Sequence, residues 1–174
     1  LSGHFQGRVL SMLSKIIRPN QILEIGTYTG YAALCLAEGL APNGQLHTIE
    51  LNDELSIIQQ KYFNLSPYKN QIKPYYGNAR EIIPTLTQNF DLVFIDADKE
   101  SYATYFDLIL PKMNSGGIIL SDNVLWSGKV VEPVKTNDKS TQAIMAYNQK
   151  INEDPRVETV LLPIRDGLTV TRIL

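Results

Sequence analysis

Short runs of apolar and β-branched residues alternate along this 174-residue chain with longer segments of helical periodicity. A helical stripe from Phe5 to Ile17, ended by Pro19, comes before the first cycle. Such alternation is typical of βαβ units, in which the strands run parallel. The predicted strands are Ile22–Ile25, Leu46–Glu50, Ile72–Tyr76, Leu92–Asp96 and Ile118–Asp122, and the predicted helices after the first four are Tyr31–Glu38, Asp53–Leu65, Ala79–Leu86 and Tyr102–Leu110.

The C-terminal part of the chain departs from this alternation of strands and helices. A predicted helix over Thr141–Asn152 is followed by two strand-like runs, Val157–Leu162 and Thr169–Ile173, with a short Asp-Gly turn between them. Such a turn predicts an antiparallel hairpin at the edge of the sheet. We therefore predict an α/β protein with a Rossmann-like, doubly wound, mostly parallel seven-stranded sheet and a terminal antiparallel hairpin, forming one domain over residues 1–174.

Composition excludes several classes of protein. Apolar residues make up 44% and charged residues 20%, which fits a globular core rather than a disordered chain. The net charge of −2 argues against a general polyanion binder, although a local basic patch stays possible. The longest apolar stretch, Tyr31 to Ala37, is too short to span a membrane. The single cysteine, Cys35, excludes an internal disulfide, and we expect a cytoplasmic protein without a membrane partner.

Ligands of such sheets bind beyond the carboxyl ends of the strands, so the residues after each strand matter most. Gly26 and Gly30 follow the first strand, and Glu50 ends the second, as in nucleoside sites where an acid accepts ribose hydroxyls. Tyr28 stands where a dinucleotide turn has its middle glycine, and its bulk would obstruct a pyrophosphate. Glu24 would repel a diphosphate but attract an ammonium or sulfonium group. These features favour S-adenosylmethionine over NAD; alternatively, the glycines serve only the turn and Glu50 is a solvated strand end.

Acidic residues end two further strands. Asp96 follows the fourth strand, and Asp122 with Asn123 follows the fifth. If these strands are neighbours, their ends lie about 5 Å apart. Two carboxylates and an amide oxygen suit a hard cation such as Mg²⁺ or Ca²⁺. Lys99 would lie beside this site, where a cation and partial burial would favour its neutral form; alternatively, it is a solvated lysine and Asp122-Asn123 an ordinary turn.

The remaining chemical candidates are weak. The connection Asn123–Ser140 is predicted to be a long loop that forms a substrate wall, with Trp126 packing either on an aromatic substrate or in the core. His47 is interpreted as a structural residue and Cys35 as core packing. None of the nine tyrosines is assigned a role beyond packing.

Three stretches of the chain resemble the metal-dependent class I O-methyltransferases of the caffeoyl-CoA and catechol type. They are residues 23–31, LEIGTYTGY; residues 96–99, DADK, with Tyr102 and Tyr105; and residues 116–128, GGIILSDNVLWSG. The end of the chain, from Asp154 to Thr169, is also similar to the family. The resemblance covers nearly the whole chain.

The resemblance implies roles for individual residues. S-adenosylmethionine would contact Glu24, Gly26 and Thr27 in its methionine part, Glu50 at the ribose, Ala79 and Arg80 at the adenine, and also Gly30 and Asp96. Asp96, Asp122 and Asn123 would bind Mg²⁺ (or Ca²⁺ or Mn²⁺), and Lys99 would be the general base that helps methylate a phenolic hydroxyl of an aromatic diol. The family is usually dimeric, so a homodimer is expected. Family members carry N-terminal helices before a segment like the start of this sequence, so we expect the domain over residues 1–174 to be without them. Ala32 stands where the family commonly has a serine.

Other functions stay open at this stage. A nicotinamide-dependent oxidoreductase is disfavoured by Tyr28, and a non-catalytic S-adenosylmethionine-binding module by the intact set of Asp96, Lys99, Asp122 and Asn123. Some family members methylate a hydroxylated uridine in tRNA. The near-neutral charge disfavours nucleic acid, although Lys69, Lys73 and Arg80 of a dimer could form a basic groove.

Overall fold

The computed structural model describes residues 2–174 and contains one seven-stranded sheet with strand order β3-β2-β1-β4-β5-β7-β6. The strands are β1 (Gln21–Ile25), β2 (Gln45–Glu50), β3 (Ile72–Tyr76), β4 (Phe90–Ile95), β5 (Met113–Asp122), β6 (Val157–Leu162) and β7 (Leu168–Ile173). Strands β1 to β5 run parallel, while β7 lies between β5 and β6 and runs antiparallel to both. The predicted fold class and the terminal hairpin are therefore confirmed, with only β6 of that hairpin at the sheet edge.

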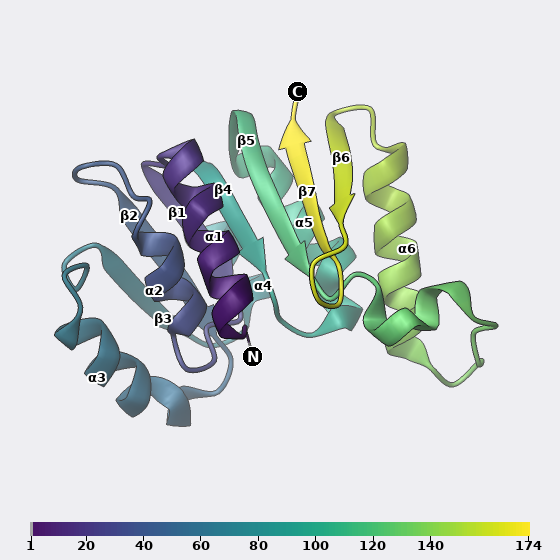
Figure 1. Ribbon diagram of the computed structural model, residues 1–174, viewed down its shortest axis with the longest axis horizontal. Helices are drawn as coiled ribbons and strands as arrows, with labels where there is room; N and C mark the ends of the chain where they lie inside the picture. Colours follow the sequence, from purple (N-terminus) through teal and green to yellow (C-terminus); the bar gives the residue numbers. More distant parts are fainter. Residues whose placement is uncertain (1) are drawn as a thin grey trace.

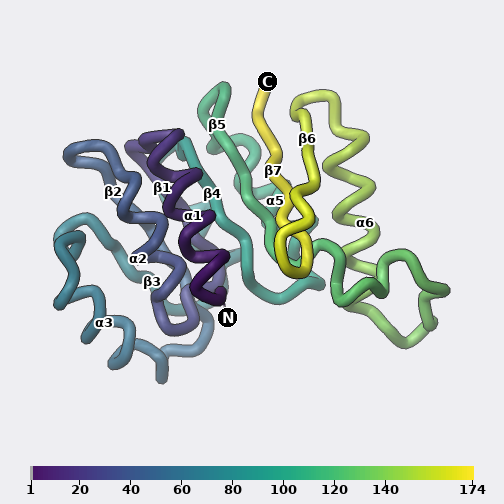
Figure 2. Tube along the Cα trace, viewed as in Figure 1, coloured from purple at the N-terminus to yellow at the C-terminus, as the bar shows by residue number. Residues whose placement is uncertain are grey.

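Helices cover both faces of the sheet (Figure 1). They are α1 (His4–Ile17), α2 (Tyr31–Ala37), α3 (Ser56–Leu65), α4 (Ala79–Thr85), α5 (Tyr102–Ile109) and α6 (Lys139–Glu153). Buried residues of α1, α2 and α3 form one core cluster with one face of the sheet, and those of α4, α5 and α6 form a second cluster with the other. The trace in Figure 2 shows the start of α1 lying near the carboxyl ends of β1 and β4. Within the described residues, no helix is both long and apolar enough to cross a membrane.

The central strands are apolar because both of their faces are covered. Val93, Phe94 and Ile95 of β4 are completely buried, one after another. This continuous burial is what a parallel strand between two helical layers requires. It also fixes the position of the residue that follows, Asp96, at the carboxyl edge of the sheet.

Helix α1 forms where predicted, but its apolar stripe does not face the core throughout. Phe5, Met12 and Ile16 are largely exposed, whereas the buried face of the helix carries Gln6, Gly7, Leu10, Ser11 and Ser14. Small residues on that face allow α1 to approach α2 closely. A Cβ atom at Gly39, just after α2, would lie only 2.2 Å from the backbone carbon of Ser14.

The long connection after β5 is not without structure, in contrast to the prediction. It contains a 3-10 segment, η4 (Trp126–Val131), with left-handed backbone at Ser127. Asn123 and Trp126 also have positive φ angles of 60° and 49°. Sequence periodicity does not reveal this segment, because tertiary hydrogen bonds rather than a repeating apolar pattern hold it.

Glu38 joins α1 to the end of α2. Its carboxylate accepts hydrogen bonds from Arg8 Nη2 at 2.6 Å, Lys15 Nζ at 2.7 Å and Ser11 Oγ at 2.7 Å. The hydrogen bond from Arg8 is the largest of the effects that lower the pKa of Glu38 from 4.5 to about 2. This carboxylate therefore stabilises the fold above its unfolded pKa, and that stabilisation is lost as pH falls from about 4.5 towards 2.

We predict that Glu38→Gln lowers the free energy of unfolding at pH 7 by about 1 kcal/mol, because the two cations are partly exposed and screened. Urea denaturation should show the difference shrinking as the pH is lowered from 5 to 3. Glu158→Gln, in the exposed ion pair with Arg172, serves as the control and should change stability by less than about 0.5 kcal/mol. An equal loss for Glu38→Gln at pH 7 and pH 3 would contradict the role of the charge.

Candidate active site

Two adjacent cavities lie across the carboxyl ends of β1, β2 and β4. The larger has a volume of about 440 Å³ and the smaller about 180 Å³, and both are lined by Gly26, Tyr28 and Asp96. The larger extends towards the end of β2 and the start of α4, and the smaller towards the start of α2. An elongated ligand with a nucleoside at one end and a small polar group at the other matches this arrangement.

Gly26 lies where the ends of β1 and β4 approach most closely. Its φ angle is 98°, and a Cβ atom at this position would lie 2.3 Å from the carbonyl oxygen of Asp96. Any larger residue would therefore be strained in its backbone and would push the two strand ends apart. Gly26 lines both cavities at this junction.

The residues predicted for the ribose and adenine line the larger cavity together. Glu50, Ala79 and Arg80 all contribute to its wall. Glu50 accepts hydrogen bonds from the backbone N–H groups of Tyr28 at 2.6 Å and Asn52 at 3.0 Å, so its carboxylate is held at the cavity edge. Asn78 caps α4 by accepting from the backbone N–H of Arg80 at 3.0 Å, which places the start of that helix at the same wall.

Thr27 lines the smaller cavity, while Gly30 and Glu24 line neither. Gly30 has a φ angle of 84°, and a Cβ atom there would meet the Phe63 ring at 2.6 Å, so the turn and its packing require a glycine. Glu24 is completely buried beneath the cavities. Its Oε2 accepts a hydrogen bond from Thr48, whereas its Oε1 has no partner among the described residues. Burial raises the pKa of Glu24 to about 8.

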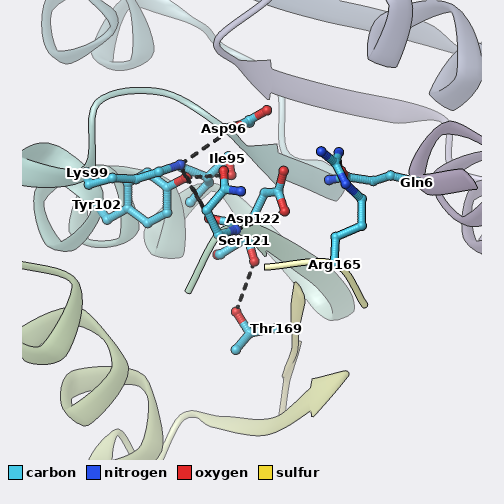
Figure 3. Close-up of polar contacts among 10 residues, drawn as sticks. Gln6, Ile95, Asp96, Lys99, Tyr102, Ser121, Asp122, Arg165 and Thr169 are labelled. Atoms are coloured by element: carbon cyan, nitrogen blue, oxygen red, sulfur yellow. Dashed lines mark hydrogen bonds and ion pairs between the residues drawn. The ribbon is translucent and has the colours of Figure 1, made fainter. Parts of the chain in front are cut away.

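Lys99 lies at the carboxyl ends of β4 and β5, in the 3-10 turn η2 (Lys99–Ser101) before α5. Its side chain is only 8% exposed. The Nζ atom donates to Asp96 Oδ1 at 3.4 Å, to the carbonyl oxygen of Asp122 at 3.4 Å, and to the Tyr102 hydroxyl (Figure 3). Burial lowers the pKa of Lys99, and the two aspartates oppose that change. The solvated-lysine alternative is therefore wrong.

Asp96 and Asp122 form the acidic pair that follows the neighbouring strands β4 and β5. Burial, together with the charge of Asp122, raises the pKa of Asp96, and Lys99 lowers it. Asp122 Oδ1 accepts from the backbone N–H of Asn123 at 2.8 Å. In the described part of the chain, no group of three His, Cys, Asp or Glu side chains is placed to hold a metal ion. The predicted set differs from such a group, because it consists of two carboxylates and the amide of Asn123.

Two tyrosines contact the polar residues after β4, so the interpretation of every tyrosine as packing is wrong. Tyr102 is completely buried and bonds to Lys99. Tyr105 lines the larger cavity and donates to Asp98 Oδ1 at 2.6 Å. Burial, reinforced by this bond, raises the pKa of Tyr105 to about 12. The spacing of Lys99, Tyr102 and Tyr105 in the sequence is the signal that could have predicted this grouping, because residues three positions apart lie on the same side of a helical turn.

The turn between β6 and β7 supports the segment that follows Asp122. Asp166 accepts from the backbone N–H groups of Ser127 at 2.6 Å and Leu125 at 3.0 Å. Arg165, at the same turn, donates to Gln6 of α1. Trp126, in a segment that contacts α6, packs partly buried against the core. His47 bonds to Tyr75 at 2.9 Å and Gln21 at 3.1 Å, in keeping with a structural role.

Glu24 generates a prediction about stability. Because its pKa is raised to about 8, the folded protein without ligand holds a proton that the unfolded chain releases above pH 4.5. The free energy of unfolding therefore falls as pH rises from about 4.5 to 8. Glu24→Gln removes this dependence on pH. We therefore expect the free energy of unfolding of the variant, relative to that of wild type, to increase by at least about 1 kcal/mol from pH 5 to pH 8 in urea denaturation. A difference that does not change with pH would contradict a buried, protonated Glu24.

Known proteins share this fold. The family model described as O-methyltransferase matches residues 2–174. Caffeoyl-CoA O-methyltransferase 2 of Eucalyptus globulus is 32% identical over 96% of this chain and 72% of its own length, and caffeoyl-CoA O-methyltransferase 5 of Nicotiana tabacum is 30% identical over 96% and 74%. The O-methyltransferase of Bacillus cereus in complex with SAH has a TM-score of 0.94 at 28% identity, covering 100% of this chain and 83% of that one. The O-methyltransferase TomG of Streptomyces achromogenes, in complex with SAM, has a TM-score of 0.93 at 27% identity, covering 99% and 81%. This chain belongs to the O-methyltransferase family and is an S-adenosylmethionine-dependent O-methyltransferase.

Proposed function

We propose that the methyl acceptor is a phenolic hydroxyl of an aromatic diol, that a divalent cation assists the reaction, and that Lys99 is the general base. The observation that carries this proposal is the buried amine of Lys99, held between Asp96 and the Asp122 carbonyl next to the two cavities. The acceptor class is supported by relatives named caffeoyl-CoA O-methyltransferases, since a caffeoyl group carries two neighbouring phenolic hydroxyls.

The cavities fit S-adenosylmethionine. Glu50, Ala79 and Arg80 would surround the nucleoside in the larger cavity, and Gly26 and Thr27 the methionine part in the smaller. Glu24 lies beneath with an unpartnered carboxyl oxygen, and a cationic ligand nearby would favour its ionised form. When bound, the cofactor supplies a methyl group on a positively charged sulfur. Asp96 touches both cavities and would lie between the cofactor and the acceptor.

The donor set also fits a hard divalent cation. Asp96, Asp122 and Asn123 offer carboxylate and amide oxygens, the ligands that Mg²⁺ and Ca²⁺ prefer. The two carboxylates are close enough for the charge of Asp122 to raise the pKa of Asp96, and a cation would relieve that repulsion. When bound, it supplies positive charge that stabilises an ionised phenol. Three protein ligands would leave coordination positions for both hydroxyls of a diol.

Lys99 would take the proton of the reacting hydroxyl. An amine can accept a proton only in its neutral form, and burial shifts Lys99 towards that form. Its three polar neighbours, Asp96, the Asp122 carbonyl and the Tyr102 hydroxyl, hold the nitrogen at the strand ends, beside the place where the cation ligands lie. Fixed positions of base and acceptor are the main requirement for this transfer.

We predict that the protein methylates caffeate or caffeoyl-CoA and that EDTA lowers the rate by at least about 100-fold, with Mg²⁺ restoring it. S-adenosylhomocysteine formation measures the rate. 4-Coumarate, with one phenolic hydroxyl, is the matched acceptor and should react far more slowly. An EDTA-insensitive rate would contradict the role of the cation, and equal rates for the two acceptors would contradict chelation.

The same assay separates the alternatives. Cofactor binding by calorimetry without turnover on any diol would favour another acceptor, such as a hydroxylated uridine in tRNA, which can be added directly. Binding without turnover on every acceptor would favour a non-catalytic module.

Replacement of the proposed base gives a second prediction. Lys99→Gln should lower kcat by about 10²-fold or more, because the amide cannot take the proton, while calorimetry should show the S-adenosylmethionine Kd changed less than twofold. Lys112→Gln is the matched control, since Lys112 also donates to a backbone carbonyl, that of Leu86 at 2.6 Å, but lies away from the site. Full activity of Lys99→Gln would show that another group accepts the proton.

A further inference from the structure

Tyr102 is the first residue of α5, and its hydroxyl lies at the junction of two strands and the Lys99 amine. The oxygen is 3.1 Å from the carbonyl oxygen of Ile95, the last residue of β4, and 3.0 Å from that of Asp122, the last residue of β5. The third neighbour is Lys99 Nζ, which donates to the same oxygen. Figure 3 shows Lys99 and Tyr102 together on one side of the acidic pair.

The directions of these hydrogen bonds follow from counting protons. A phenol has one proton to donate, and two carbonyl oxygens that cannot donate compete for it. The hydroxyl proton is therefore directed at the strand ends, and the lone pairs of the oxygen are left to accept from Lys99. The Nζ atom also lies 4.5 Å from the centre of the Tyr102 ring, so the lysine side chain lies against the tyrosine.

The ring of Tyr102 is itself fixed. It is completely buried and packs edge-on against the Tyr147 ring, with centroids 5.4 Å apart and an interplanar angle of 87°. The hydroxyl therefore has one position, set by the core on one side and by two strand ends on the other. A lysine has four rotatable side-chain bonds, and a fixed acceptor at its tip removes most of that freedom.

We propose that Tyr102 is a positioning residue, whose hydroxyl connects the ends of β4 and β5 to the Lys99 amine and holds that amine at the point of proton transfer. The inference rests on the proposed role of Lys99 as the general base. It adds a residue that touches neither cofactor nor acceptor and that sets where the base lies.

The test compares two tyrosines. Tyr102→Phe keeps the buried ring and removes only the hydroxyl. Tyr147→Phe is the matched control, because Tyr147 is equally buried, packs on the same ring, and bonds through its hydroxyl to Ser121 Oγ at 2.5 Å rather than to Lys99. Both variants should lose thermal stability, and only Tyr102→Phe should lose catalysis.

For Tyr102→Phe we expect kcat to fall about 10- to 100-fold, as a displaced catalytic group does. The acceptor KM and the S-adenosylmethionine Kd should change less than twofold, and Tyr147→Phe should keep kcat within twofold of wild type. A measurement independent of turnover follows the acetylation of Lys99 by acetic anhydride with peptide mass spectrometry. The rate at Lys99 should rise in Tyr102→Phe and not in Tyr147→Phe.

A double variant separates the failure of this inference from failure of the proposed function. Tyr102→Phe combined with Lys99→Gln should be no slower than Lys99→Gln alone, because the hydroxyl acts only through the amine. An active Lys99→Gln variant overturns the proposed base and this inference together. Three results overturn the positioning role alone. They are a fully active Tyr102→Phe together with an inactive Lys99→Gln, additive effects in the double variant, and a Tyr102→Phe protein that does not fold.

Discussion

The close approach of β1 and β4 at their carboxyl ends is the constraint on which the site depends. Gly26 leaves no room for a side chain against the Asp96 carbonyl, its N–H donates to the Ile49 carbonyl at 3.0 Å, and the Asp96 N–H donates to the Ile25 carbonyl at 2.9 Å. These contacts align the ends of three strands. Because Asp96 borders both cavities and also contacts Lys99, a shift at this junction would move the cofactor region and the reacting groups together.

Burial and charge have opposite effects on neighbouring groups of the site. Glu24 is buried with one carboxyl oxygen unpartnered, which raises its pKa, while Lys99 is buried between acidic residues that partly offset the lowering of its own pKa. In both groups burial thus shifts the pKa towards the neutral form. Such displacements are concentrated at functional sites, where a ligand supplies the missing partner. For Glu24, the positively charged cofactor is a ligand of this kind.

The antiparallel strand β7 has a structural role at the site although it carries none of the proposed catalytic groups. Its insertion beside β5 brings the β6–β7 turn under the segment after Asp122, where Asp166 holds the backbone of Leu125 and Ser127. Arg165 connects the same turn to Gln6 at the start of α1. Residues far apart in the chain thereby support the acidic end of the site, and an αL backbone at Asn123 and Trp126 is held by these contacts.

The sequence by itself determined the sheet, the parallel direction of its first five strands, the hairpin, and the residues that follow each strand. Burial on both faces of the sheet leaves continuous apolar runs in the sequence, and acidic residues and glycines mark where these runs end. Glu50, Ala79, Arg80 and Asp96, which the family resemblance assigns to the cofactor, line one cavity. The tertiary structure alone decided which face of α1 is buried, that Glu24 lies beneath the cavities, and that Tyr102 contacts Lys99. These outcomes depend on the distances between helices and strands. The periodicity of apolar residues in the sequence does not show whether a small polar residue faces a neighbouring helix, or whether a tyrosine hydroxyl contacts the end of a strand.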